Sequence, residues 1–253
     1  MKQSQAKKRD NAMTNKILMG LIALVLGLLF LEILIVHSKN EQQKNASNQV
    51  QTARIMANGD LLYHDGLYMS ALQADGSYDF TENFTYVKPW LKQADLVLGD
   101  FEGTINPDYP LSGYPLFNAP QSVTAAIKDA GYDVMDLAHN HILDSGLEGA
   151  FTTADALKKV GIDPIGVYEK PVRDKAPLLI KNVNGIKVAI LSYAYGYNGL
   201  ESNLTDKEVA DHLSNLDEKR MKAEIQRAEK EADITVIMPQ MGVEYQIEPT
   251  EEQ

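Results

Sequence analysis

The chain has 253 residues, enough to bury a substantial hydrophobic core, and it contains no cysteine. The absence of cysteine excludes disulfides, thiolate ligands and a cysteine nucleophile. A bound metal would therefore need His, Asp, Glu or Asn ligands, which suit Mn, Mg, Fe or Zn. Residues 1–16 carry a net charge of +4 and residues 17–253 carry −15. This acidic body argues against nucleic acid as a partner, because nucleic-acid binding depends on neutralising phosphates.

The first predicted element is a membrane-spanning helix over residues 17–37. Residues 17–36 are apolar except for Glu32, and twenty helical residues span roughly 30 Å, the thickness of a bilayer core. A buried core helix would show a polar face, and a cleaved signal peptide would have a shorter apolar region and a small-residue cleavage site. We therefore expect a single-pass anchor in the cell membrane, with the basic residues 1–16 in the cytoplasm and the rest of the chain outside.

Residues 38–52 are polar and lack periodicity, which predicts a flexible stalk. From residue 53 on, short apolar runs alternate with amphipathic segments. We predict strands and a hairpin over 54–60, 95–100, 133–141, 163–168, 176–193 and 233–240. We predict helices over 84–94, 119–132 and 146–161, and a long charged helix within 205–232.

The alternation of strands and helices predicts an α/β domain over residues 53–253, with a largely parallel or mixed sheet. The hairpin should turn at Asn184 and Gly185 in a type I′ turn. The sequence stops after a strand and a loop, with no closing helix and no polar tail, so we expect the domain to be truncated.

Three of the predicted strands end in residues that can hold a metal or move a proton. Asp60 and Asp100 each follow a glycine, which would let the backbone turn sharply, and the third strand ends in Asn140 and His141. Since ligands of α/β sheets lie outside the carboxyl ends of the strands, these residues would gather around one point. Their types are those of a two-metal hydrolytic site. Taken singly, each Gly-Asp is more often a turn or a helix cap, and Asn-His is more often a polar loop.

Other polar residues lie beside these strand ends. His64 and Glu102 follow the two Gly-Asp pairs and are candidate ligands or proton carriers. We expect His139 and His141 to face opposite ways, with His139 packing or supporting the site. Asp144 precedes a predicted helix and is either its N-cap or a site residue.

These stretches together resemble a known family. "GDLLYHD" (59–65), "GDFEG" (99–103), "LAHNHILDSG" (137–146) and "MPQMGVEYQIEPTEEQ" (238–253) resemble the poly-gamma-glutamate capsule-synthesis family of the CapA type. So does the spacing of Thr153, Leu157, Gly161, Ile162 and Gly166. That family resembles calcineurin-like metallophosphoesterases and is commonly membrane-anchored. The resemblance therefore implies a metallophosphoesterase-like α-β-β-α sandwich outside the membrane, incomplete in this chain.

The resemblance also implies the site. It makes Asp60, Asp100, Asn140 and His141 the candidate ligands of one or two divalent ions. His141 would also act in catalysis, together with the pocket residues Glu102 and His64.

The sequence departs from the family pattern in two places. The family usually reads His-Trp-Gly where Gln240 and Met241 stand here, and an amide is a weaker ligand than imidazole. A further His-rich block of the family does not occur before Gln253, and without it a second metal would lose ligands.

Two functions remain open at this point. One is a surface enzyme, a metal-dependent phosphoesterase-like hydrolase that works with other membrane components of a polymer synthase. The other is a non-catalytic accessory or binding subunit of the same complex, with a degenerate or vestigial metal site. The resemblance favours a role in capsule, poly-gamma-glutamate or other surface-polymer synthesis or export in either case. The acidic body would not attract a polyanion unless a metal supplied positive charge.

Overall fold

The structure is a computed structural model that describes residue 28 and residues 30–39, 50–251 and 253. The chain divides into two units, Met1–Val50 and Gln51–Gln253. In the first unit, residues 28 and 30–39 are helical and exposed. Among the described residues, no helix combines the length and the apolar character that crossing a membrane requires. The predicted basic tail, most of the predicted anchor and most of the predicted stalk lie outside the described residues, so these remain predictions.

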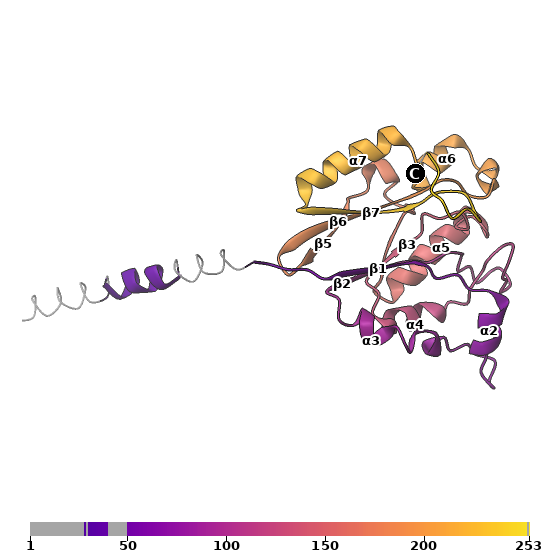
Figure 1. The fold of residues 1–253 in the computed structure, drawn as a ribbon, viewed down its shortest axis with the longest axis horizontal. Helices are drawn as coiled ribbons and strands as arrows, with labels where there is room; N and C mark the ends of the chain where they lie inside the picture. The colour runs from indigo at the N-terminus through magenta and orange to yellow at the C-terminus, as the bar shows by residue number, and fades with distance from the viewer. Residues whose placement is uncertain (1–27, 29, 40–49, 252) are drawn as a thin grey trace, which may run out of the picture. The chain divides into compact units, whose positions relative to one another are not determined.

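The second unit begins with a parallel four-stranded sheet in the order β1-β2-β3-β4 (Figure 1). Its strands are β1 (Ile55–Asp60), β2 (Leu96–Asp100), β3 (Val134–Asp136) and β4 (Asp163–Ile165). Parallel neighbours require crossover connections, and helices supply them here. The connections contain α2 (Asp65–Ala71), η1 (Thr81–Phe84), α3 (Lys88–Leu91), α4 (Val123–Ala130) and α5 (Gly146–Lys159).

The second sheet has the order β5-β6-β7. It consists of β5 (Leu179–Val183) and β6 (Ile186–Ala194), which form an antiparallel hairpin, and β7 (Ile234–Gln240), which runs parallel to β6. The predicted hairpin turn is confirmed, because Asn184 and Gly185 both have positive φ, as a type I′ turn needs. The connecting helices are η2 (Arg173–Lys175), η3 (Leu200–Asn203), α6 (Asp206–His212) and α7 (Glu218–Glu231).

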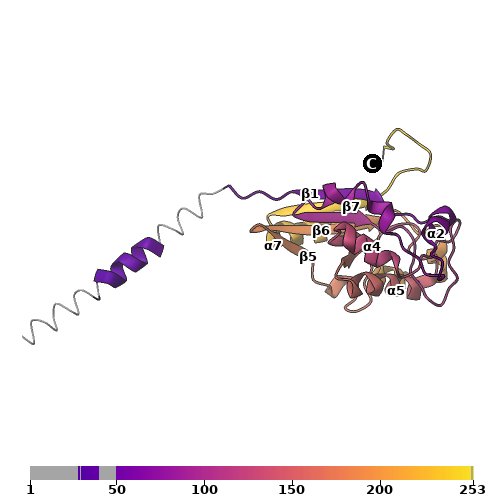
Figure 2. The ribbon, with the colours of Figure 1, turned by 90° about the horizontal axis from the view of Figure 1, so that it is seen from below.

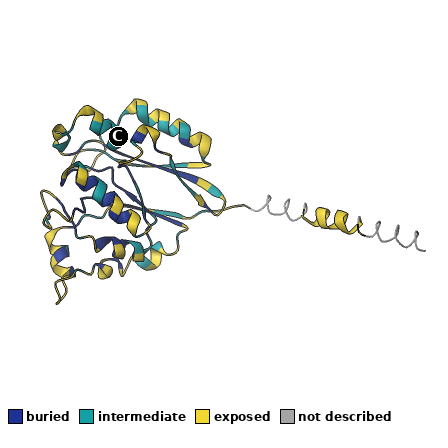
Figure 3. Ribbon diagram, turned by 180° about the vertical axis from the view of Figure 1, so that it is seen from behind, coloured by how far each residue is buried: buried dark blue, intermediate teal, exposed yellow. Residues whose placement is uncertain are grey.

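Side chains that alternate along the strands build four layers, helix–sheet–sheet–helix (Figure 1). Seen from below, the strands of the two sheets overlap (Figure 2). Leu96 and Leu98 of β2 face Val188 and Ile190 of β6 between the two sheets. Val97 of β2 points the other way, into a cluster that includes α4 and α5. On the far side, α7 contributes the spaced residues Met221, Ile225 and Ala228 to a cluster with β6. Figure 3 shows intermediate and exposed residues along α7, in which Ala228 is the one buried residue. The predicted α/β class and its layer order are confirmed.

Three predicted elements differ from the structure. The strand predicted over 133–141 ends at Asp136, and the chain then turns through a loop that leads to α5. The helix predicted over 84–94 is reduced to η1 and the four-residue α3. The long charged helix predicted within 205–232 is two helices, α6 and α7. Between them, Leu213 and Asn215 form isolated β-bridges with Val167 and Ala194. Asp217 then caps α7, because its side chain accepts a hydrogen bond from the backbone N–H of Arg220.

Candidate functional site

Three aspartates lie side by side where β1, β2 and β3 end. The strand register pairs Asp60 with Asp100, and Asp100 with Asp136. The sequence predicted that the first two would meet at this edge. It missed Asp136, although β3 ends on aspartate as β1 and β2 do, because the strand was predicted to run on to residue 141.

Packing explains the glycine before Asp100 but not the one before Asp60, because a Cβ atom added at Gly59 would meet nothing within 4 Å. Neither Gly59 nor Gly99 adopts a positive φ, so the expected sharp turn is not what requires glycine here. A Cβ atom added at Gly99 would lie 2.7 Å from the ring of Tyr132, which is too close for any other residue. The missing side chain lets Tyr132 cover the strand just before Asp100.

Two carboxylates of this cluster, Asp100 and Asp136, favour their neutral forms because their pKa values are raised. Burial raises the pKa of Asp100 to about 9, and the nearby charges of Asp136 and Asp60 add to the effect. One oxygen of Asp100, Oδ1, is buried and has no hydrogen-bond partner. Burial also raises the pKa of Asp136 to about 8, although its Oδ1 accepts a hydrogen bond of 2.7 Å from the Ala138 backbone. Asp100 and Asp136 are thus buried acids, whereas Asp60 is exposed.

His141 is held by a carboxylate behind it. Its Nδ1 lies 2.8 Å from Oδ2 of Asp144, and that oxygen also accepts a hydrogen bond of 2.6 Å from the Phe117 backbone N–H. The other ring nitrogen, Nε2, lies 3.9 Å from Glu102. Burial alone would lower the pKa of His141, but the hydrogen bond and charge of Asp144, with the charge of Glu102, raise it overall.

Asp144 is therefore not a helix cap. The N-cap of α5 is Ser145, and no side chain caps this helix. Of the two roles left open by the sequence, the capping role is wrong, and Asp144 instead lies against the His141 ring.

His139 lies in the protein interior beneath the loop. Burial lowers its pKa to about 3, so the ring is neutral, and its Nδ1 accepts a hydrogen bond of 3.2 Å from the His141 backbone N–H. His139 thus supports the backbone of His141, which matches the expected packing role. The predicted strand was wrong here, because residues 139–141 form a loop. Strand alternation would also have put these two histidines on the same face.

Asn140 is tied to a distant strand. Its Oδ1 accepts a hydrogen bond of 2.9 Å from Nε2 of Gln240, and its backbone N–H donates one of 2.6 Å to Oε1 of the same residue. Its Nδ2 donates to Oδ1 of Asn198 at 3.2 Å. Asn198 also lies 3.4 Å from Nε2 of His141. Sequence reasoning missed Asn198, which no strand-end pattern marks.

These residues surround one open cleft of about 420 Å³. Asp60, Glu102, Asn140, His141 and His64 all line it, whereas Asp100 is buried at the end of β2. No lysine or arginine of the described chain lines this cleft. The cleft is therefore acidic at its floor and lacks its own counter-charge.

Aromatic side chains shape the wall of the cleft. Phe117 stands edge-on to both His64 and His141, with ring centroids 4.8 Å apart in each case. This contact keeps His64 on the same wall as His141, so the predicted histidines lie in one cleft. Three tyrosines also line the cleft, Tyr114, Tyr195 and Tyr245.

The donor types fit a divalent cation such as Mn, Mg, Fe or Zn, because carboxylate and amide oxygens suit Mg and Mn and imidazole suits Fe and Zn. The unpartnered oxygen of Asp100 and the raised carboxyl pKa values are what a cation at this position would relieve. In residues 50–251, however, no three His, Asp or Glu side chains are already arranged as a metal site. Ligation would require Asn140 to release Gln240 and the carboxylates to move together.

The fold and the site define an α/β sandwich with an acidic, histidine-containing cleft at the ends of its parallel strands. Residues 54–253 match the family described as bacterial capsule synthesis protein PGA_cap. The chain belongs to this family, which confirms the resemblance seen in the sequence.

Two curated relatives carry related names. The chain is 30% identical over 179 residues to "Capsule biosynthesis protein CapA" of Bacillus anthracis, covering 67% of this chain and 43% of that protein. It is 25% identical over 249 residues to "PGA biosynthesis protein CapA" of Bacillus subtilis strain 168, covering 97% of this chain and 63% of that protein. The chain thus spans less than two thirds of the length of either relative.

A solved structure from Staphylococcus aureus is also similar, the "Putative 5'-Nucleotidase" in complex with alpha-ketoglutarate. The TM-score is 0.48 and the sequence identity is 13%, and the match covers 78% of this chain and 39% of that one.

Proposed function

We propose that this protein takes part in the synthesis or export of a capsule polymer, with poly-gamma-glutamate as the first candidate. Membership of the capsule-synthesis family supports this role, and so do the names of the two Bacillus relatives. The protein would work at the outer face of the cell membrane, held by the predicted single-pass helix, beside other membrane components of the polymer synthase. The apolar stretch of residues 17–36 supports this location.

The acidic cleft is the proposed working site, as a metal-dependent, phosphoesterase-like hydrolase centre. The observation that carries this proposal is the row of strand-end aspartates, of which Asp100 has a buried, unpartnered oxygen. Asp60, Asp100, Asn140 and His141 would hold one or two divalent ions, Mn, Mg, Fe or Zn. A bound divalent ion polarises a phosphoryl or acyl oxygen and lowers the pKa of bound water.

The side chains around these ligands have distinct tasks in the proposal. Asp144 fixes the ring of His141 through Nδ1, which leaves Nε2 on the side of Glu102 and the cleft. Nε2 of His141 would serve either as a metal ligand or as the proton donor to a leaving group, because one nitrogen cannot do both at once. Burial raises the pKa of Glu102 to about 8, so this carboxyl can carry a proton at neutral pH. His64 lines the same wall and would orient the substrate.

One observation favours the second function, a non-catalytic accessory subunit. The side chain of Gln240 uses its oxygen and its nitrogen on Asn140, which leaves the amide oxygen of Asn140 occupied. If this contact persists when metal is supplied, the cleft has no complete ligand set. It would then serve as a binding surface for the polymer or for a partner subunit.

The test is polymer formation in the source bacterium after deletion of the gene. Plasmids would supply the wild-type chain, Asp100→Asn, His141→Gln or the exposed-site control Asp155→Asn, and surface poly-gamma-glutamate would be measured. We expect the wild type and Asp155→Asn to restore the polymer and both cleft variants to fail at equal protein levels. Restoration by all four would support the accessory function. Unchanged polymer after the deletion would overturn both.

A further inference from the structure

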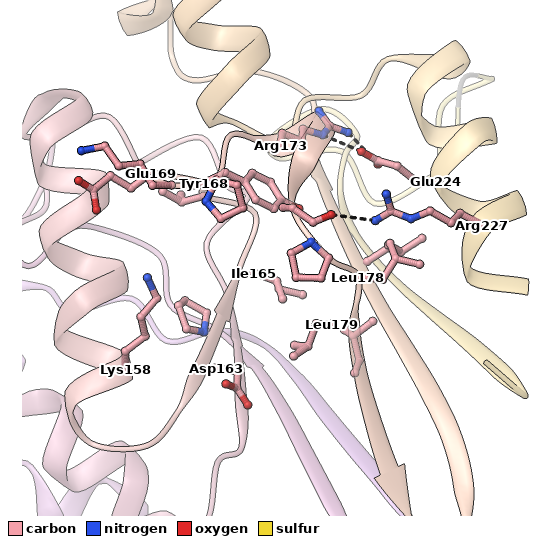
Figure 4. Close-up of a pocket in the computed structure, with 18 residues that line it drawn as sticks. Lys158, Asp163, Ile165, Tyr168, Glu169, Arg173, Leu178, Leu179, Glu224 and Arg227 are labelled. Atoms are coloured by element: carbon pink, nitrogen blue, oxygen red, sulfur yellow. Dashed lines mark hydrogen bonds and ion pairs between the residues drawn. The ribbon is translucent and has the colours of Figure 1, made fainter. Parts of the chain in front are cut away.

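A second pocket of about 340 Å³ lies between the outer strands of the two sheets, β4 and β5 (Figure 4). None of its lining residues lines the acidic cleft. We call it the β4–β5 pocket, and it is defined by Ile165, Tyr168, Leu178, Leu179, Arg173 and Arg227. No step of the proposed function uses it.

The floor of the β4–β5 pocket is apolar. Ile165 of β4, Leu179 of β5 and Ile190 of β6 line it, and all three belong to the hydrophobic cluster between the sheets. The pocket is thus an opening into the sandwich interior at the edge where both sheets end. An apolar group that entered it would extend the core and lose contact with water. Its volume lies at the lower end of the usual range for small-molecule sites.

The upper wall is fixed before any ligand binds. Arg173 donates two hydrogen bonds of 2.9 Å to Glu224 of α7, and Glu224 also accepts one of 2.9 Å from the Tyr193 hydroxyl. The Arg173 side chain is fully buried. This network holds α7 over the pocket, and a rigid wall lowers the entropy lost on binding.

The rim is cationic although the domain is acidic. Four cationic and three anionic residues line the pocket, whereas residues 17–253 carry −15. Glu224 compensates Arg173, and Lys181 pairs with Asp163 at the mouth. The charges left at the rim are Lys158, Lys170 and Arg227 against Glu169. Lys158 has only an exposed ion pair with Asp155, which compensates it weakly.

Arg227 is the residue aimed at an incoming ligand. One of its terminal nitrogens donates to the Ala176 carbonyl at 3.1 Å, which fixes the guanidinium above the apolar floor (Figure 4). Its Nε is buried without a hydrogen-bond partner, and the nearest carboxylate, Glu231, is 3.9 Å away. A planar guanidinium with free donors is well suited to a carboxylate.

We propose that the β4–β5 pocket binds a small amphipathic carboxylate, with its apolar body on the leucine and isoleucine floor and its charge at Arg227. The volume accommodates roughly ten water-sized groups at about 30 Å³ each. A two-chain membrane lipid exceeds this space, so the ligand is a free small molecule. A single anionic charge is favoured over two, because Glu169 lies on the same rim.

The experiment is calorimetric titration of the full chain with 4-phenylbutyrate and with its neutral counterpart, 4-phenyl-1-butanol. We expect the acid to bind at least tenfold more tightly than the alcohol, as a charge-assisted hydrogen bond implies. Arg227→Gln should remove that preference, and Lys222→Gln, an exposed position on the same helix, should keep it. Leu179→Trp, which fills the floor, should abolish binding of both compounds.

Several outcomes would overturn the proposal. They are equal affinity for acid and alcohol, an unchanged preference in Arg227→Gln, or binding of phosphatidylglycerol vesicles without binding of 4-phenylbutyrate. If Leu179→Trp does not fold, as judged by its thermal melt, the rim variant Arg227→Gln still decides. Loss of polymer formation in Asp100→Asn has no bearing on this result, because the two pockets share no residue.

Discussion

Two replacements of Asp144 should distinguish the effect of its hydrogen bonds on stability from the effect of its charge on the pKa of His141. The side chain of Asp144 is 1% exposed, and its Oδ2 receives the Phe117 N–H at 2.6 Å and the His141 ring at 2.8 Å. Asp144→Ala leaves a buried N–H without an acceptor, which costs about 1–3 kcal/mol, and removes a charge-assisted hydrogen bond worth about 1.5–3 kcal/mol. We expect the free energy of unfolding to fall by roughly 3–5 kcal/mol.

The matched variant is Asp144→Asn, which keeps one oxygen as acceptor and loses only the charge. We expect it to cost about 1–2 kcal/mol and to lower the pKa of His141, since Asp144 is what raises it most. The assay is urea unfolding of the wild type, both variants, His141→Asn and the double variants, with the His141 titration followed by NMR. An Ala variant that loses less than about 1 kcal/mol, or additive effects of the Asp144 and His141 changes, would refute the coupling.

Three further predictions concern the buried carboxyls of the cleft, the Arg173 network and Gln240. The metal-free chain should lose stability as pH rises from about 5 to 9, because the folded pKa values of Asp100 and Glu102, about 9 and about 8, lie above their unfolded values. Urea unfolding at several pH values should show a loss of up to about 1.4 kcal/mol per pH unit for each group. Asp100→Asn should reduce this dependence of the unfolding free energy on pH. Arg173→Met should cost about 3–5 kcal/mol in thermal or urea unfolding, because it strands the partly buried Glu224, and a cost below about 1 kcal/mol would contradict that role. Gln240→His should tighten Mn²⁺ binding about tenfold in equilibrium dialysis, since imidazole is the better ligand, and unchanged affinity would place residue 240 outside the site.

The strand pattern allowed the α/β class and the meeting of two candidate site residues to be predicted, whereas the two-sheet sandwich was implied only by the family resemblance. Alternation in β2 puts Leu96 and Leu98 on one face and Val97 on the other. This alternation does not depend on the conformation of the loops, so it can be read from the sequence. The carboxyl end of a parallel strand is a fixed place in the sheet, so Asp60 and Asp100 could be put together from their spacing alone.

The features that could not be predicted depend on where the strands end and on contacts between distant parts of the chain. The apolar run continues past β3 through Leu137 and Ala138, but the sheet ends at Asp136, and a loop then turns His141 back onto Asp144. The contacts of Asn140 with Gln240 and Asn198 join residues 100 and 58 positions apart. No local pattern signals such pairs, because they arise only when the two sheets stack.

Divalent-metal binding by the full chain tests the proposed cleft most directly. Mn²⁺ would be titrated at pH 7 into the wild type, Asp100→Asn and the exposed-site control Asp155→Asn, with bound metal and released protons both measured. We expect the wild type and Asp155→Asn to bind Mn²⁺ with proton release, because the raised carboxyl pKa values must fall when a cation arrives, and Asp100→Asn to lose both signals. A wild-type chain that binds no divalent ion, or an Asp100→Asn chain that binds it equally well, would contradict the metal-dependent site.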